Sequence, residues 1–144
     1  MRLFSQDTKV QALKGVPLFE GLSHRELVQL ERVCEDLEVE PGRVLCKEGE
    51  VGREFFVLVD GKVQVSRKGR RVATLTGGEF LGEIALVTEL PRTATVTVET
   101  PVRLFVLTSR EFHAVLDRNP KVERKVLRAL ARRLAETSSD PTLA

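Results

Sequence analysis

Residues 78–96 combine the residue types that a phosphate site needs. The stretch begins with glycines, which let the backbone approach a ligand closely, and continues into a helix-capable run over Glu83 to Val87. A glycine-led turn at the start of a helix offers free backbone N–H groups and a partial positive charge. Arg92, which directly follows Pro91, adds a planar set of donors that matches two phosphate oxygens at once. The spacing therefore predicts an anion site.

Glu83 is unexpected beside a phosphate, because its carboxylate would repel one. It fits a ligand that also presents hydroxyl groups, such as those of a ribose, which a carboxylate accepts. The alternative is that Glu83 only favours the first turn of the short helix, and the two roles can coexist. Arg92 could likewise be a surface arginine after a turn. Its small neighbours Thr93 and Ala94 would admit a ligand and favour the binding role.

The run Gly82-Glu83-Ile84-Ala85-Leu86, followed by Pro91-Arg92-Thr93-Ala94, resembles the phosphate-binding cassette of the cyclic nucleotide-binding domain family. The family includes regulatory subunits of cAMP-dependent protein kinase, cyclic nucleotide-gated channels and the catabolite activator protein, and the similarity extends from about Phe19 to the C-terminal helix. The resemblance implies cAMP or cGMP as ligand, with the arginine on the cyclic phosphate and the glutamate on the ribose 2′-hydroxyl. The ligand-binding residues predicted in this way are Gly82, Glu83, Ile84, Ala85, Arg92, Thr93 and Ala94.

Two departures from the family pattern concern the surroundings of this cassette. Many relatives carry an acid, which orients the phosphate arginine, where this chain has Arg53. Either Glu54 or another residue takes over that role, or the coupling is absent. The chain has no Trp or Tyr and no aromatic residue after Phe112, so no aromatic lid can come from the last helix. We expect Leu127, Leu130 or Arg128 to cover the base instead. Thr93 accompanies both nucleotides in the family and does not decide between them.

Composition is that of one ordinary globular domain. The chain has 144 residues, 42% of them apolar and 31% charged, and a net charge of +2 that is too small to indicate nucleic acid or membrane binding by itself. It has no apolar run near the ~20 residues of a membrane span, and no apolar N-terminal signal, so we expect a cytoplasmic location. The two cysteines and two histidines have no metal-binding spacing. We therefore expect both cysteines to be buried free thiols and expect no metal site. We also expect no cofactor beyond the nucleotide ligand.

Hydrophobic periodicity predicts an α+β, mainly β fold. Helices are expected over 7–36, an antiparallel jelly-roll-like β-roll over 37–108, C-terminal helices over 109–136 and a polar tail over 137–144, all in one domain of 1–144. Ser23 and Glu26 form a capping box pattern, and the segment from Val16 to Leu22 should pack without regular structure.

Within the roll, 55–59 is apolar on both faces and predicts a buried strand. Val63 and Val65 alternate with polar Lys62, Gln64 and Arg67 after Asp60-Gly61, which predicts a hairpin at that dipeptide. In the strand after the cassette, Ala94, Val96 and Val98 should point to one face, and Thr95, Thr97 and Glu99 to the other. Ser109 is expected to cap the next helix, and Asn119-Pro120 to begin the last one. Its predicted apolar stripe comprises Val122, Val126, Leu127, Leu130 and Leu134.

Four functions compete for this pattern. A non-enzymatic sensor would bind the nucleotide and reposition its C-terminal helices for an effector protein of unknown identity, with a homodimer through the last helix as a further expectation. A cupin-type enzyme needs clustered histidines, whereas His24 and His113 lie outside the predicted strands. A DNA-binding regulator needs a winged helix-turn-helix, and the chain ends about where that module would begin, so we expect no direct DNA binding. A degenerate domain could keep the fold and bind a protein or a different ligand.

Overall fold

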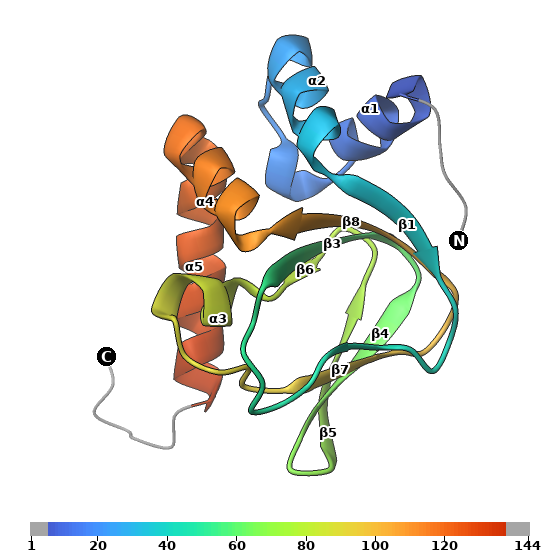
Figure 1. Ribbon diagram of the computed structural model, residues 1–144, viewed down its shortest axis with the longest axis vertical. Helices are drawn as coiled ribbons and strands as arrows, with labels where there is room; N and C mark the ends of the chain where they lie inside the picture. Colours follow the sequence, from blue (N-terminus) through green and yellow to red (C-terminus); the bar gives the residue numbers. More distant parts are fainter. Residues whose placement is uncertain (1–5, 138–144) are drawn as a thin grey trace.

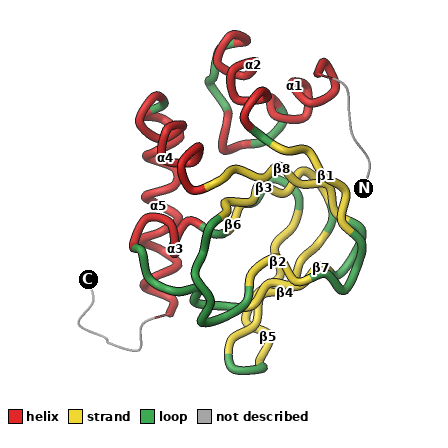
Figure 2. Tube along the Cα trace, viewed as in Figure 1, coloured by secondary structure: helices red, strands yellow, loops and turns green. Residues whose placement is uncertain are grey.

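Residues 6–137 are described by the computed structural model, and they form a β-roll with helices at one end (Figure 1). Two four-stranded antiparallel sheets face each other, one in the order β1-β8-β3-β6 and the other in the order β2-β7-β4-β5. Figure 2 shows the helices gathered beside the first sheet. The strands are β1 (Glu35–Val39), β2 (Val44–Cys46), β3 (Glu54–Asp60), β4 (Lys62–Arg67), β5 (Arg70–Thr76), β6 (Phe80–Leu81), β7 (Thr95–Val98) and β8 (Val102–Thr108). The predicted fold class is confirmed.

The strand β3 is apolar on both faces because it separates two hydrophobic cores. Phe55 and Val57 pack into the core between the first sheet and the helices, while Phe56 and Leu58 pack into the core between the two sheets. Alternate side chains of a strand point to opposite faces, so a strand between two cores has no polar face. The buried strand predicted over 55–59 is confirmed.

The hairpin predicted at Asp60-Gly61 is wrong. The strand β3 pairs with β6 and β8, whereas β4 pairs with β5 and β7 in the other sheet. The dipeptide therefore carries the chain from one sheet to the other. The hairpin lies instead at Lys68-Gly69 between β4 and β5, where both residues have positive φ angles of 52° and 77°. Two successive residues with positive φ suit the right-handed twist of a tight hairpin.

Three N-terminal helical segments cover the first sheet: α1 (Gln6–Lys14), a 3₁₀ turn (Pro17–Phe19) and α2 (His24–Val33). The capping box is confirmed, because Ser23 and Glu26 exchange side chain-to-backbone hydrogen bonds of 2.9 and 3.1 Å. The 3₁₀ turn corrects the expectation of irregular structure in this link. The roll also begins slightly earlier than predicted, since β1 starts at Glu35.

The C-terminal half contributes α3 (Glu83–Thr88), α4 (Ser109–Arg118) and α5 (Pro120–Thr137). Thr108, and not Ser109, caps α4, because its hydroxyl accepts the 3.2 Å hydrogen bond from the N–H of Glu111. The stripe of α5 is buried at Val122, Val126, Ala129 and Leu130, but Leu127 is 50% exposed, which corrects its predicted place. Residues 138–144 of the predicted tail lie outside the described part of the chain.

Candidate ligand-binding site

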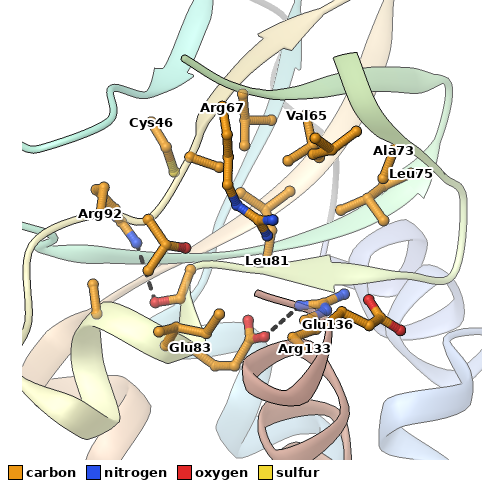
Figure 3. A pocket seen from close by; sticks show the side chains of 17 residues that line it. Cys46, Val65, Arg67, Ala73, Leu75, Leu81, Glu83, Arg92, Arg133 and Glu136 are labelled. Carbon is orange, nitrogen blue, oxygen red and sulfur yellow. Dashed lines mark hydrogen bonds and ion pairs between the residues drawn. The ribbon is translucent and has the colours of Figure 1, made fainter. Parts of the chain in front are cut away.

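A cavity of about 450 Å³ opens between the second sheet, the cassette and α5 (Figure 3). Its walls come from segments far apart in the chain: β4 and β5 on one side, the start of α3 and residues 92–94 on another, and α5 on a third. All seven residues predicted from the cassette line this one cavity: Gly82, Glu83, Ile84, Ala85, Arg92, Thr93 and Ala94. The fold thus brings them together, and their role in binding remains a prediction.

Arg92 is held in place by backbone carbonyls. Its side chain is 92% removed from solvent, and its two terminal nitrogens donate hydrogen bonds of 3.1 Å to Gly82 O and 2.7 Å to Glu54 O. Neither acceptor carries a net charge, and no carboxylate of the described residues lies within ion-pair distance of this guanidinium. The positive charge is therefore positioned but not neutralised, which favours an anion in the cavity.

Gly82 and Gly52 make room for this guanidinium. Gly82 has a φ of 100°, and a Cβ there would lie 2.7 Å from Glu54 O and 2.9 Å from Arg92 Nη1. A Cβ at Gly52 would lie 2.9 Å from Arg92 Cζ. Both positions therefore exclude a side chain. At Gly82 the left-handed backbone is a second reason for glycine.

The acid of the cassette is buried and half satisfied. Glu83 is 1% exposed; its Oε1 accepts a hydrogen bond from Arg133 Nη1 of α5, while its Oε2 is buried with no hydrogen-bond partner in the described residues. Arg133 also donates to Phe80 O at 2.6 Å, and its guanidinium lies 5.1 Å from the centroid of the Phe80 ring. A carboxylate oxygen without a partner, on a residue that lines a cavity, can accept a hydrogen bond from a ligand hydroxyl.

Arg53 does not take the place of the acid that relatives use. It is exposed, and its backbone carbonyl accepts from the N–H of Ser109. Of the alternatives left open by the sequence, the residue that holds Arg92 from this stretch is Glu54, and it does so through its main-chain carbonyl. A backbone acceptor is independent of side-chain identity, so sequence alone gives no signal for it.

The side of the cavity away from Arg92 includes apolar residues of the second sheet. Figure 3 shows Val65 of β4 and Ala73 and Leu75 of β5 there. The helix α5 contributes Arg133 and Glu136, whereas Leu127, Leu130 and Arg128, expected to cover the base, are absent from the lining. Figure 3 shows Arg133 and Glu136 at the helical edge of this space.

Two arginines of the cavity were missed in the sequence, although spacing marks both. Arg133 follows the buried Leu130 by three residues and so continues the inward face of α5. Arg67 was grouped with the outward residues of its strand, but its position differs from Val63 and Val65 by an even number, and it lines the cavity. For Arg67, the charge of the residue outweighed its position in our interpretation.

Cys46 lies in the wall of the cavity as a buried free thiol, and Cys34 is a buried free thiol of the helical core, as predicted. Burial raises the pKa of Cys46 to about 11, and the nearby Arg92 opposes that rise only in part. Burial also raises the pKa of Cys34. Both thiols are therefore protonated and unreactive near neutral pH.

Within residues 6–137, no three His, Cys, Asp or Glu side chains come together as metal ligands would. Over the same range, no helix has the length and apolar character that crossing a bilayer requires. The charged lining of the cavity consists of three arginines (Arg67, Arg92, Arg133) and two glutamates (Glu83, Glu136). Such a lining suits a small anionic ligand with polar groups at one end and an apolar surface at the other.

A β-roll with a buried, positioned arginine and an acid on one cavity defines a ligand-binding domain. The family model of the cyclic nucleotide-binding domain matches residues 36–119. The chain belongs to this family.

Proteins of known class share this similarity. A cyclic nucleotide-gated potassium channel of Rhizobium etli is 36% identical over 124 residues, which are 85% of this chain and 35% of the channel. A cAMP-dependent protein kinase regulatory subunit of Yarrowia lipolytica is 38% identical over 106 residues, 72% of this chain and 28% of that protein. The chain thus spans about a third of the length of these relatives.

Solved structures give the same fold. The catabolite activator protein of Thermus thermophilus is 30% identical with a TM-score of 0.72, covering 83% of this chain and 59% of its own. A cAMP-binding acyltransferase from Mycobacterium smegmatis is 29% identical with a TM-score of 0.74, covering 91% of this chain and 42% of the other. This domain is therefore homologous to domains of regulatory proteins and of at least one enzyme.

Proposed function

We propose that this domain binds a cyclic nucleotide, cAMP or cGMP, and acts as a regulatory sensor without catalytic activity of its own. The observation that carries the proposal is that Arg92, whose charge is not neutralised, and Glu83, whose Oε2 has no hydrogen-bond partner in the described residues, line the same cavity. A cyclic phosphate is a singly charged anion with two free oxygens, and a ribose offers the hydroxyl that a buried carboxylate lacks. The gated channel and kinase subunit named above support this ligand class.

Within this proposal each cassette residue has a role. Arg92 binds the phosphate, and the N–H groups of Ile84 and Ala85 in the first turn of α3, which have no acceptor inside the helix, point donors at phosphate or sugar. Gly82 and Ala94 keep the wall close to the ligand, and Thr93 offers a hydroxyl. The apolar strands β4 and β5 then receive the purine.

The sensor output follows from the contact between the cassette and the last helix. Glu83 forms an ion pair with Arg133 of α5. A ribose hydroxyl that donates a hydrogen bond to the Glu83 carboxylate therefore changes the strength of the contact between the cassette and α5. A ligand shifts such an equilibrium only by the difference between its affinities for the two arrangements. An effector protein would read the position of α4 and α5.

Calorimetric titration with cAMP and cGMP tests the proposal, with 5′-AMP and 5′-GMP as non-cyclic controls. Binding of at least one cyclic nucleotide with a 1:1 ratio is expected. Arg92→Ala should weaken it by about 2–5 kcal/mol, because a desolvated charged contact is lost. Circular dichroism must show that the variant remains folded. A folded wild-type protein that binds neither nucleotide would refute the proposal and select the alternative, a degenerate domain that binds a protein or another ligand.

A homodimer through α5 also remains a prediction. Leu127 is the large apolar residue of the described part of that helix that is half exposed, and Arg124 and Arg128 are exposed beside it. Sedimentation equilibrium with and without nucleotide, on the wild type and Leu127→Glu, measures the association. A wild-type protein that stays monomeric at all concentrations in both states would contradict it.

A further inference from the structure

We propose that Arg67 makes this site selective for cyclic nucleotides with a 6-oxopurine base, such as guanine or hypoxanthine, over those with adenine. The inference rests on the proposed binding of cyclic nucleotides and adds the identity of the base. It assigns to β4 a specificity residue that lies outside the cassette.

Arg67 is a charged side chain of the cavity that has no ion-pair partner among the described residues. It lines the cavity, its Nε is buried with no hydrogen-bond partner in the described residues, and no carboxylate of those residues forms an ion pair with it. A guanidinium stays protonated at all relevant pH values. A buried, unpaired donor on such a group destabilises the empty protein, and a ligand that accepts from it removes that cost.

The location of Arg67 favours contact with a base. Figure 3 shows its side chain extending from β4 into the cavity, with Arg92 toward one end and Val65, Ala73 and Leu75 toward the other. Arg92 with the first turn of α3 forms the polar end, where the phosphate and sugar would bind. The planar purine then extends toward the apolar strands, and the guanidinium of Arg67 lies along that path.

The chemistry of the purine edges decides which base fits. A guanidinium has only donors, arranged in a plane, and it matches a pair of neighbouring acceptors. Guanine presents N7 and O6, which are both acceptors, and paired Arg contacts to them are the commonest specific protein–guanine contact. Adenine presents N7 beside its N6 amino group, which is a donor, so one guanidinium donor would face another donor. A 6-oxopurine satisfies Arg67, whereas adenine leaves it partly unpaired.

The competing explanation is that Arg67 is a second contact to the phosphate. The cavity would then hold the phosphate between Arg92 and Arg67, and the base would have no influence on the contribution of Arg67. The two explanations differ in one measurable respect. A base contact changes the ratio of affinities between nucleotides, whereas a phosphate contact changes all affinities by the same factor.

Calorimetric titration of cGMP, inosine 3′,5′-cyclic monophosphate and cAMP into the wild-type protein and Arg67→Met separates them. The wild type should bind both 6-oxo nucleotides roughly 5- to 150-fold more tightly than cAMP, the range of one good two-bond base contact. The inosine nucleotide lacks the 2-amino group, so it isolates the contribution of O6. In Arg67→Met this preference should fall to within about twofold, with little loss for cAMP.

Two further variants serve as controls for the role of Arg67. Arg71→Met removes the same charge from the neighbouring strand β5 at an exposed site paired with Glu99, and it should leave the preference unchanged. Arg67→Lys keeps a cation but replaces the planar donor pair with a point charge, so it should retain affinity and lose most of the preference. It also provides a test if the methionine variant does not fold.

Three results would overturn the inference. A wild-type protein that binds cAMP as tightly as cGMP, or more tightly, would exclude selection by Arg67 while leaving nucleotide binding intact. An equal weakening of all three nucleotides in Arg67→Met would assign Arg67 to the phosphate. Absence of binding of every cyclic nucleotide to folded wild-type protein would instead refute the proposed function, and the inference with it.

Discussion

Replacing Arg133 with methionine should destabilise this domain far more than replacing any exposed arginine of the same helix. Methionine keeps much of the length and apolar volume of the side chain but removes its charge and donors. In the folded protein, Glu83 would then be a carboxylate with 1% exposure, one oxygen newly unpaired and the other already without a partner. The carbonyl of Phe80 would lose its 2.6 Å donor as well.

The magnitude follows from the burial of the two partners. Removing one member of a buried ion pair costs about 3–5 kcal/mol. The Arg133 side chain is 22% exposed, so water reaches the space it vacates, and the lower end of the range, about 3 kcal/mol, applies. Glu83→Gln leaves a cation that is already partly hydrated and should cost only about 1 kcal/mol. The double variant should lie within about 1 kcal/mol of Glu83→Gln, since no charge is then left unpaired.

Urea denaturation followed by far-ultraviolet circular dichroism measures these values, because the chain contains no Trp or Tyr for intrinsic fluorescence. Arg132→Met is the matched control: it is the adjacent residue of α5, it is exposed, and its cost should stay within about 0.5 kcal/mol. A loss for Arg133→Met no larger than that of this control would show that the variant does not leave Glu83 as a buried, unpaired charge. The coupling between the cassette and α5 would then be refuted.

Four further predictions have defined outcomes. Gly52→Ala should lower the free energy of unfolding by about 1–3 kcal/mol in urea denaturation, because its Cβ would lie 2.6 Å from Ala85 Cβ and 2.9 Å from Arg92 Cζ. Cys46 should react with iodoacetamide at pH 8 about 100-fold more slowly than an exposed thiol, by peptide mass spectrometry, since its pKa is raised to about 11. For the same reason the wild-type free energy of unfolding should fall as pH rises from about 9 to about 11, where the unfolded thiol has lost its proton and the folded thiol has kept it, and Cys46→Ser should lack that part of the slope. Thr108→Ala should cost about 1 kcal/mol in urea denaturation and Ser109→Ala distinctly less, because only the former removes the cap of α4.

Local pattern sufficed to predict most of the fold. The alternation of Ala94, Val96 and Val98 predicted that they share one face, which is buried, and the capping box predicted the start of α2. Both signals involve residues within a few positions of one another, so the chain carries them without reference to its tertiary contacts. The cassette belongs to the same class, because its glycine, acid and arginine lie within eleven residues of sequence.

Features that depend on distant contacts were not predictable in the same way. An Asp-Gly pair suits both a hairpin and a passage between two sheets, and the choice at Gly61 depends on the turn that precedes β8. A Cβ at Gly61 would lie 2.5 Å from Pro101 O, so the glycine is needed for this close approach of two chain segments. The partner of Glu83 was hidden for a related reason, since Arg133 is fifty residues away in sequence.

The way Arg92 is held explains why a basic residue at position 53 need not abolish an anion site. A carboxylate partner would orient the guanidinium but also neutralise it, and a ligand phosphate would then compete with that partner. Here two backbone carbonyls orient it, at 3.1 and 2.7 Å, and leave its full charge directed at the cavity. The two carbonyl dipoles stabilise the cation before an anion enters. Unlike a carboxylate partner, they need not be displaced when the anion binds. Preorganisation of Arg92 therefore resides in the close approach of Gly82 and Glu54, and Arg53, exposed and outside that contact, is free to differ from the family pattern.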